Sequence, residues 1–570
     1  MSLVKFGVFA AICVAQSGIV LGDDYHLKDA LILTWNASAW EEGVKPGEND
    51  TAIVRDFTYN RQYFEKGQMW SIALEQNEEI ETFKFTDLYG LNISGNNVTL
   101  KLNKVICEDM SPGPGDTAQV ATNRFYMTYL SFKGETNEFY VGVNHVFDLK
   151  SGTVNMTEGA PLIKTGPGTM IHSGSAWGAA AAPVWVQEGD YIRTGNGYPG
   201  FRGDIIVGGC GKPAQLKVEP TAHTTFMPPA NFLDIRPGGT VTLRYAAAAP
   251  TIYQERFLID HGVLDAGGAT YYMYNQGATE CGPDYALDGG TMTNGVILMT
   301  SDNLRIIPSD RSSTLYGTLD FNAKFDVPVP DGPAPVDFLL VGDLRGLNRG
   351  IGKAGEGTMV VRCADHVSTW GGIAGRTFDV KAGEFFIESE DTGIGFGTNN
   401  VVVAAGATYG GVGRHVGAED PLRGRQGNVT LNGEAGKVTA FAVGRKNVET
   451  GALTPGQYTM GSDAQPNDLT FGVACTLRIA ANESAVSRLV VNGTFTLGED
   501  NVLAIEGPED PAELPSGDHV IVSAIEPLNA TFSAVTYNGE PLSRQCGKIV
   551  YGENSVVFHV PVRGLSVIVR

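Results

Sequence analysis

Charged residues are scarce in this sequence of 570 residues, and basic residues are scarcer than acidic ones. Only 18% of the residues are charged, and 41 Lys and Arg stand against 63 Asp and Glu, which leaves a formal net charge of −22. A nucleic-acid binder needs a basic surface for the phosphates, so we expect no nucleic-acid partner. The hydrophobic share of 42% is too high for a disordered tail. The chain is therefore expected to fold around a core.

Closely spaced cysteines are also missing. The chain has 7 cysteines, and none of them forms a Cys-x-x-Cys pair. This excludes a zinc ribbon and a compact disulfide scaffold. Those beyond the N-terminal segment are Cys107, Cys210, Cys281, Cys363, Cys475 and Cys546. They are either buried single thiols or members of bridges between distant cysteines, and the sequence leaves both readings open.

Long hydrophobic runs are absent beyond the N-terminus, where no stretch reaches the roughly 18 consecutive apolar residues of a transmembrane helix. Residues 1–22 contain one basic residue, Lys5, then an apolar run from Phe6 to Val14 and then small residues. This order is typical of a secretory signal peptide, and a buried N-terminal strand is the alternative. We expect a secreted or extracellular protein, located at the cell surface or released, with no transmembrane span.

Glycine is the residue that is abundant, with 73 of them in the chain. They follow no strict third-position period, which excludes a collagen helix. Instead they punctuate short β-prone runs, together with Asn and Asp, and no long segment shows the 3.6-residue apolar period of a helix. A short helix between Gln68 and Phe85 is the one exception that the sequence suggests. The pattern predicts an all-β protein.

The clearest repeat lies beyond residue 352. Turn glycines recur there at Gly357, Gly383, Gly406 and Gly427, at intervals of 26, 23 and 21 residues. Such intervals are typical of the coils of a solenoid, and the corners between short strands often need the positive φ that glycine allows. In the segment VTAFAVG, alternation predicts a strand that is buried on both faces. We expect about 15 coils in all.

The content of aromatic residues and glycine changes along the chain. After the signal peptide at 1–22, residues 23–150 are aromatic and poor in glycine, which suggests an N-terminal β-rich cap or small domain. Residues 151–500 are expected to form a parallel β-helix, with the clearest repeats at 352–500. Residues 501–570 are expected to form C-terminal strands and a cap.

Several consecutive sequence segments beyond residue 352 resemble the autotransporter-associated β-strand repeat. They include GKAGEGTMVV, RTFDVKAGEFFIES, VVVAAGATYGGVG, TGALTPGQYTMG and SRLVVNGTFTLGEDNVLAI. The resemblance implies a right-handed parallel β-helix that is exported and displayed at the cell surface or released from it. It implies no shared enzymatic activity. The chain ends in GLSVIVR, without the strands of the membrane barrel that closes an autotransporter, so we expect no self-insertion into a membrane.

Residues that carry catalytic chemistry are few. The candidates are Asp260 with His261 in LIDHG, Asp365 with His366 in RCADH, and His415 beside Arg414. Neighbouring residues of a strand point to opposite faces, so each Asp-His pair would need a partner from an adjacent coil, and the sequence identifies none. Calcium-binding repeats, EF-hand loops and a phosphate-binding Gly-Lys-Ser/Thr loop are also missing. We therefore expect no catalytic residue, no bound cofactor and no metal ligand.

The leading interpretation is a noncatalytic β-solenoid with a structural or adhesive role at a bacterial cell surface. Its partner would be a cell-surface polysaccharide or another surface protein. The first alternative is a polysaccharide lyase or hydrolase on a pectate-lyase-like β-helix. The second is a glycan-binding module that uses exposed aromatic residues, such as those from Tyr271 to Tyr274. Ligand and oligomeric state cannot be read from the sequence.

Overall fold

The computed structural model describes most of the chain between residues 22 and 562. The residues it leaves out there are 29–33, 56–61, 63–64, 66–67, 87–88, 110–119, 151, 158, 174–175, 178–181, 195–202, 222–230, 246–250, 254–255, 274–284, 300–303, 322–325, 347–350, 364–376, 390–393, 397–399, 416–418, 421–423 and 426. Strands make up 58% of the protein and form a parallel β-solenoid of about 14 turns, as expected for a parallel β-helix. The chain divides into unit 1, Met1–Gly203, and unit 2, Asp204–Arg570.

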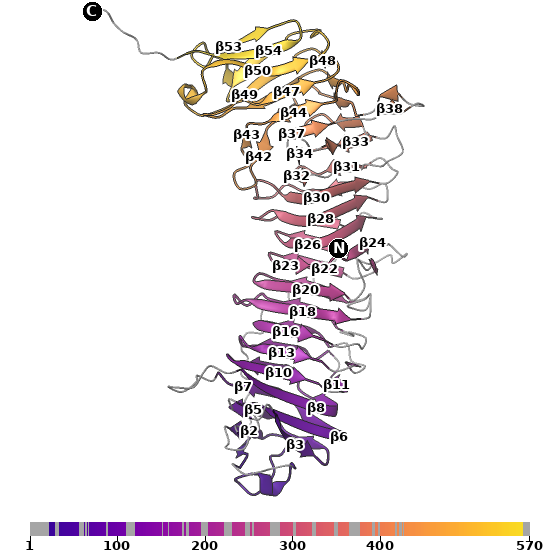
Figure 1. The fold of residues 1–570 in the computed structure, drawn as a ribbon, viewed down its shortest axis with the longest axis vertical. Coiled ribbons are helices and arrows are strands. Elements are labelled where there is room, and N and C mark those ends of the chain that lie inside the picture. The colour runs from indigo at the N-terminus through magenta and orange to yellow at the C-terminus, as the bar shows by residue number, and fades with distance from the viewer. Residues whose placement is uncertain are drawn as a thin grey trace, which may run out of the picture. The chain divides into compact units, whose positions relative to one another are not determined.

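Unit 1 stacks its strands in three parallel ladders (Figure 1). The first contains β1 (Asp24–His26), β2 (Thr51–Arg55), β5 (Thr82–Thr86), β7 (Lys104–Cys107), β9 (Asn137–Val141), β12 (Leu162–Thr165) and β15 (Val184–Val186). The second contains β3 (Trp70–Leu74), β6 (Leu91–Leu102), β8 (Ala121–Phe132), β10 (His145–Leu149), β13 (Thr169–His172) and β16 (Gly189–Arg193). The third contains β4 (Glu78–Glu79), the second halves of β6 and β8, β11 (Thr153–Met156) and β14 (Ala176–Trp177). A short 3₁₀ turn, η2 (Ala37–Ala39), lies near the N-terminal end.

The aromatic residues of unit 1 fill the inside of its coils. Phe83 stacks on Phe85 with ring centroids 4.7 Å apart, and Phe125 meets Phe83 at 5.3 Å and Phe147 at 5.0 Å. All four rings are fully buried. Because alternate residues of a strand face inward, β5 contributes two of these rings and β8 and β10 contribute one each to a continuous stack.

The stack explains the composition of residues 23–150 without a change of architecture. Parallel pairing is already present at β1 and β2, and β8 pairs in parallel with β10 and with β11, which lies beyond residue 150. The expectation of a short helix between Gln68 and Phe85 is wrong, because that segment forms β3, β4 and most of β5. Alternation of buried and exposed residues in β3 makes it a strand with one inward face.

Unit 2 repeats the arrangement with more coils. Its first set of ladders contains β17 (Ile205–Val207), β19 (Phe232–Ile235), β22 (Arg256–Asp260), β25 (Tyr285–Asp288) and β27 (Leu304–Ile307), and then β29 (Val327–Pro328), β31 (Ile351–Ala354), β33 (Thr377–Val380), β36 (Asn400–Val403), β40 (Val429–Leu431), β45 (Leu469–Phe471) and β48 (Phe495–Leu497). The second ladder contains β18 (Ala214–Thr221), β20 (Gly239–Tyr245), β23 (Val263–Asp265), β26 (Thr291–Met299), β28 (Ser313–Phe321), β30 (Phe338–Gly346), β32 (Thr358–Cys363), β34 (Glu384–Ser389), β37 (Thr408–His415), β41 (Thr439–Val443), β46 (Cys475–Ala480), β49 (Val502–Glu506) and β51 (Ala534–Tyr537).

The remaining strands of unit 2 lie on a third side or in hairpins. The third side contains β21 (Thr251–Tyr253), β24 (Thr270–Met273), β35 (Ile394–Phe396), β44 (Gln457–Met460), β47 (Arg488–Val491) and β50 (Gly517–Ala524). Two short hairpins are β38 (Glu419–Asp420) with β39 (Gly424–Arg425), and β42 (Arg445–Lys446) with β43 (Leu453–Thr454). The C-terminal strands are β52 (Glu540–Pro541), β53 (Lys548–Tyr551) and β54 (Ser555–Val560), and η3 (Pro511–Glu513) is a 3₁₀ turn.

Three of the four turn glycines of the repeat lie at equivalent corners. Gly357, Gly383 and Gly406 come just before β32, β34 and β37. Gly383 and Gly406 have φ of 62° and 89°, and a Cβ at Gly357 would lie 2.4 Å from a backbone oxygen of Pro330. Gly427 also has a positive φ of 93°, but it precedes β40 and therefore lies at a different corner. The interval from Gly406 to Gly427 therefore does not correspond to one full coil of the solenoid.

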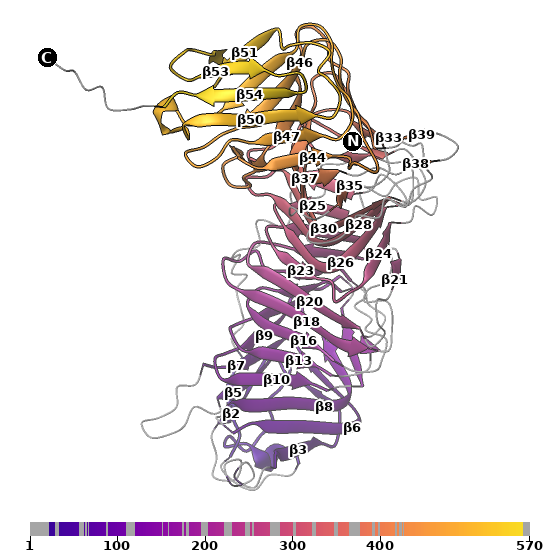
Figure 2. The same cartoon turned by 45° about the horizontal axis from the view of Figure 1, so that its top comes forward.

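Parallel pairing changes to antiparallel pairing near the C-terminal end of unit 2. β54 pairs antiparallel with both β50 and β53, and β52 folds back on β51 (Figure 2). An antiparallel layer uses the hydrogen-bonding groups that the last parallel coil would otherwise leave open.

The hairpin β42–β43 covers part of the outer face of unit 2, beside β34 (Figure 1). Val448 and Leu453 of this hairpin pack against a buried outer cluster of Val336, Leu339, Val360, Phe386 and Ala442. The strand β41 is consequently buried at every position, which confirms the prediction for Thr439–Val443. Val438, the first residue of VTAFAVG, precedes the strand and is 70% exposed, so the prediction is wrong there. Its outward Ala442 meets the hairpin cluster, while Phe441 packs on the ring of Tyr458 at 5.2 Å.

The structure describes some of the cysteines beyond the N-terminal segment. Cys475 and Cys546 are buried free thiols, and burial raises the pKa of Cys475. Cys281 and the side chain of Cys363 lie outside the described residues, as do residues 1–21 of the expected signal peptide.

Among the residues that the structure describes, no helix is long and apolar enough to cross a membrane.

Candidate functional site

The Asp260–His261 pair lies at a corner of unit 2, and its two side chains meet. Asp260 is the last residue of β22, and His261 has a φ of 53°, so it lies outside the alternation of the strand. His261 Nδ1 is 2.7 Å from Asp260 Oδ1. The expectation that the two side chains point to opposite faces is therefore wrong, because it treats His261 as a strand residue.

Partners for this pair come from the next two coils. The register of β22 and β25 places Asp288 beside Asp260, and the His261 N–H donates to the backbone oxygen of Asp288 at 2.9 Å. Beyond β27, Asp310 Oδ1 lies 2.8 Å from His261 Nε2 and Ser309 Oγ lies 3.3 Å from the same nitrogen. The signal that sequence reasoning missed is the recurrence of Asp at the end of β22 and of β25, in LIDHG and ALDGG.

His261 is the one basic side chain in this group of three carboxylates. Hydrogen bonds that the His261 ring donates to Asp310 and to Asp260 raise the pKa of His261, and the contact with His261 lowers the pKa of Asp310. Burial raises the pKa of Asp288. Both ring nitrogens face carboxylates, which fits an imidazolium that donates at each end. We describe this group, Asp260, His261, Asp288 and Asp310, as the corner clasp.

Two groups in the described part of the chain have the spacing of metal ligands. The ligand atoms of Asp260, His261 and Asp288 lie within 4.8 Å of one another, and so do those of His26, Glu41 and Glu42. In the corner clasp a metal ion would have to displace the proton that His261 shares with Asp260. With the proton in place, His261 forms ion pairs with Asp260 and Asp310.

The other sequence candidates do not build a site. His415 ends β37 and is buried, and desolvation lowers its pKa to about 4, so it is neutral at physiological pH. The neighbouring Arg414 donates its backbone N–H to Ser389 Oγ at 3.3 Å. Asp365 and His366 lie outside the described residues. Tyr271, expected to be an exposed ligand-binding aromatic, is buried and packs edge-on against Phe257 at 5.6 Å.

A second charged group lies under the hairpin β42–β43. Glu388 accepts from Arg362 Nε at 2.8 Å and from the Lys446 backbone N–H at 2.6 Å. Glu384 binds Lys446 Nζ at 2.5 Å and Arg478 at 3.1 Å. Desolvation raises the pKa of Glu388, whose carboxylate is only 2% exposed. These ion pairs attach the hairpin to the coils.

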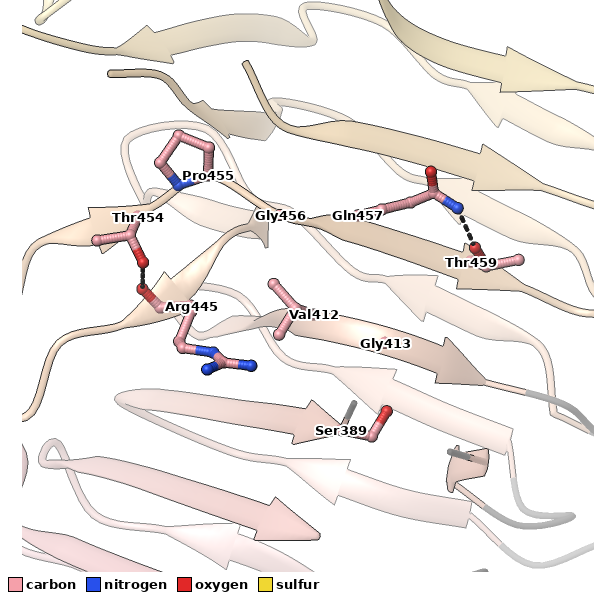
Figure 3. Close-up of a pocket in the computed structure, with 9 residues that line it drawn as sticks. All are labelled: Ser389, Val412, Gly413, Arg445, Thr454, Pro455, Gly456, Gln457 and Thr459. Atoms are coloured by element: carbon pink, nitrogen blue, oxygen red, sulfur yellow. Dashed lines mark hydrogen bonds between the residues drawn. The ribbon is translucent and has the colours of Figure 1, made fainter. Parts of the chain in front are cut away.

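The pocket beside this hairpin has a volume of about 690 Å³ (Figure 3). Its lining residues are Ser389, Val412, Gly413, Arg445, Thr454, Pro455, Gly456, Gln457 and Thr459. Figure 3 shows the Arg445 guanidinium beside Val412, with Ser389 on the neighbouring strand below it. Thr454 donates to the Arg445 carbonyl at 3.3 Å, and Gln457 donates to Thr459 at 3.0 Å. These nine residues include no carboxylate and no imidazole, so they offer no acid–base pair.

A larger groove of about 880 Å³ lies on the outer face of unit 1. Its lining residues are Ala73, Leu74, Glu75, Ser94, Gly95, Asn96, Tyr126, Met127, Thr128, Lys150, Gly152 and Ser173, which we call the unit 1 groove. Glu75 is the one carboxylate among them. Serine, threonine and asparagine side chains supply neutral hydrogen-bonding groups beside an exposed tyrosine, a composition suited to binding rather than to acid–base chemistry.

Comparison with known proteins adds no identity to this picture. No protein-family model matches the chain, and no curated protein matches it.

Proposed function

We propose that this protein is an exported, noncatalytic β-solenoid with a structural or adhesive role at a cell surface. The observation that carries the proposal is the composition of its two described grooves. The pocket beside the hairpin β42–β43 has no carboxylate among its lining residues, and the unit 1 groove has one, Glu75. Glycoside hydrolysis uses two carboxyl groups that flank the scissile bond, about 5 to 9.5 Å apart. Neither groove supplies such a pair.

Export and display rest on the sequence. Residues 1–22 have the pattern of a secretory signal peptide, and the phrases beyond residue 352 resemble a repeat of surface-displayed proteins. The ladders of parallel strands agree with that resemblance, since any parallel β-helix would contain them. The proposed partner is a cell-surface polysaccharide or another surface protein.

One observation favours a second candidate function, a polysaccharide lyase or hydrolase. The corner clasp brings three carboxylates and a histidine together from adjacent coils, which is the convergence that such an enzyme needs. The carboxylates of the clasp face His261, however, and they line neither of the two grooves. For this reason we place the clasp among the structural ion pairs.

Incubation of the purified protein with neutral and with uronic-acid polysaccharides distinguishes binding from cleavage. We expect retention of the protein on one or more insoluble polysaccharides, or on whole cells, without release of reducing ends or unsaturated products. Cleavage by the wild-type protein that is lost in both Asp260→Asn and His261→Ala would overturn the proposal in favour of the enzyme. Fusing residues 1–22 to a reporter tests export, and a reporter retained in the cytoplasm contradicts it.

A further inference from the structure

The unit 1 groove runs across neighbouring coils of the solenoid. The register pairs Ala73 with Ser94 and Ser94 with Tyr126. The next coil continues this row, because the Lys150 backbone N–H donates to the carbonyl of Phe125 at 2.9 Å. Adjacent rungs of a parallel sheet lie about 4.8 Å apart, so the row presents one side chain per rung to a ligand that extends along it.

Tyr126 is the exposed aromatic residue of this row. It is 55% exposed, whereas Phe125 and Met127 on either side of it face inward and are buried. Tyr129 on the same strand is 42% exposed. An aromatic ring left open on a sheet surface is a characteristic of ligand contact, because its apolar face is available for stacking while its hydroxyl stays hydrated.

Lys150 supplies the charge of the groove. Its ammonium lies 5.5 Å from the centroid of the Tyr126 ring. No ion pair forms between Lys150 and a carboxylate of the described residues, although the nearby Arg124 binds Asp148 at 2.7 Å. In a chain with a net charge of −22, a lysine without a carboxylate partner inside a groove favours an anionic ligand at that position.

The other lining groups favour a hydroxyl-rich ligand. Asn96 offers an amide, and Ser94, Thr128 and Ser173 offer hydroxyl oxygens. These hydroxyls already donate to the Ile72 carbonyl at 3.4 Å, the Gly95 carbonyl at 3.5 Å and Asp148 Oδ1 at 2.7 Å, so they face a ligand as acceptors. Thr128 Oγ1 already accepts the Asn97 N–H at 3.0 Å, which fixes its position at the edge of the groove. Such neutral donors and acceptors match sugar hydroxyls and add no charge of their own.

We infer that the unit 1 groove binds an extended polysaccharide that carries carboxylate groups. Tyr126 stacks on the face of a sugar ring, and the Lys150 ammonium pairs with the carboxylate of a uronic acid. The inference rests on the proposed noncatalytic role, since a bound chain would meet only one carboxylate, Glu75. It makes unit 1 the region that recognises the surface partner.

Binding of polygalacturonate to the full chain, and of its carboxyl-reduced polymer as the neutral counterpart, tests the inference. We expect Tyr126→Ala to weaken binding of both polymers about tenfold or more and Tyr126→Phe to retain it, because the ring carries the contact. Lys150→Gln should weaken binding of polygalacturonate about tenfold and leave the reduced polymer unaffected. Affinity electrophoresis and calorimetry measure these changes, and circular dichroism confirms folding of each variant.

Two matched variants lie outside the groove. Tyr316→Ala removes a tyrosine of β28 that is 47% exposed, and Lys101→Gln removes a lysine paired with Glu79 in unit 1. Both should bind like the wild type. The inference is overturned if neither polymer binds, if Tyr126→Ala binds normally, or if Lys150→Gln weakens both polymers equally. Cleavage of polygalacturonate with unchanged dependence on Tyr126 would instead overturn the noncatalytic function and leave the binding groove in place.

Discussion

Unit 1 and unit 2 differ most on the outer faces of their coils. In unit 1 the outer face of β8 leaves Tyr126 and Tyr129 exposed beside a groove. In unit 2 the hairpin β42–β43 covers the outward Phe386 and Ala442 and is held there by ion pairs. The same parallel stacking therefore supports an open outer face at β8 of unit 1 and a second buried layer at β34 and β41 of unit 2. Function in such a scaffold depends on what lies outside the coils.

The inside of the coils is where the units agree. Each has a buried lysine at a corner whose ammonium donates to backbone carbonyls. Lys164 reaches the oxygens of Gly166 and Glu188 at 2.6 and 2.8 Å, and Lys353 reaches those of Gly355 and Ala382 at 2.6 and 2.7 Å. Burial lowers the pKa of both lysines to about 8. Corner carbonyls that no strand can pair are thus satisfied by a side chain in both units.

Replacing aromatic rings on the inner and outer faces of the coils by alanine should give the largest difference in the free energy of unfolding. Phe125→Ala in unit 1 and Phe386→Ala in unit 2 should each lower the free energy of unfolding by about 3 to 5 kcal/mol, because both rings are fully buried. Tyr126→Ala should change it by less than about 0.5 kcal/mol. Urea denaturation of the intact chain measures all three. A negligible cost for Phe386→Ala would mean that the hairpin does not cover this face in solution.

Removing the buried carboxylate under the hairpin should have the next largest effect. Glu388→Gln leaves Arg362 without its partner, and we expect a loss of about 3 kcal/mol together with faster proteolysis within residues 445–454. Glu434→Gln is the matched control, because its pair with Lys437 is exposed and worth less than about 0.5 kcal/mol. An intact hairpin in Glu388→Gln would show that apolar packing alone attaches it.

Acid should weaken unit 1 through His145. Burial lowers the pKa of His145 to about 4, whereas an unfolded histidine has a pKa of about 6.5. The unfolded state therefore takes up the proton first, and stability falls as the pH drops from about 6.5 to 4, by about 3 kcal/mol. Replacing His145 with Gln should flatten this part of the pH profile in denaturant titrations. An unchanged acid slope in this variant contradicts the assignment.

The corner clasp of unit 2 should show the opposite dependence with a smaller amplitude. The pKa of His261 is raised, so its contribution is complete below the unfolded pKa of about 6.5 and is lost as the pH rises through the folded pKa. We expect His261→Gln to cost about 1 kcal/mol in mild acid and less in mild alkali. Denaturant midpoints of both proteins across this range measure the difference. A cost that grows with pH would exclude the imidazolium clasp.

Much of the fold follows from local sequence signals. Short β-prone runs separated by glycine predict the all-β solenoid, and the corners at Gly383 and Gly406 need the positive φ that only glycine adopts without strain. The coil that follows Gly406 does not stand out in the sequence, because the hairpin β38–β39 and the turn before β40 lie within it and add residues that belong to no repeat. Composition alone does not distinguish inward from outward aromatic residues, so it predicts neither the burial of Tyr271 nor the exposure of Tyr126.

The sequence by itself determined the strand class and the corner glycines, since these depend on backbone sterics and on alternation within single strands. Burial of the outer face of β41 also needs the hairpin β42–β43, which covers Ala442. Only the tertiary structure decided which residues of different coils meet. The register of β22 with β25 brings Asp288 to Asp260, and the left-handed turn at His261 carries its ring to Asp310. The open groove around Tyr126 and Lys150 depends on the register of β6 with β8, because parallel strands assemble a surface from residues that are far apart along the chain.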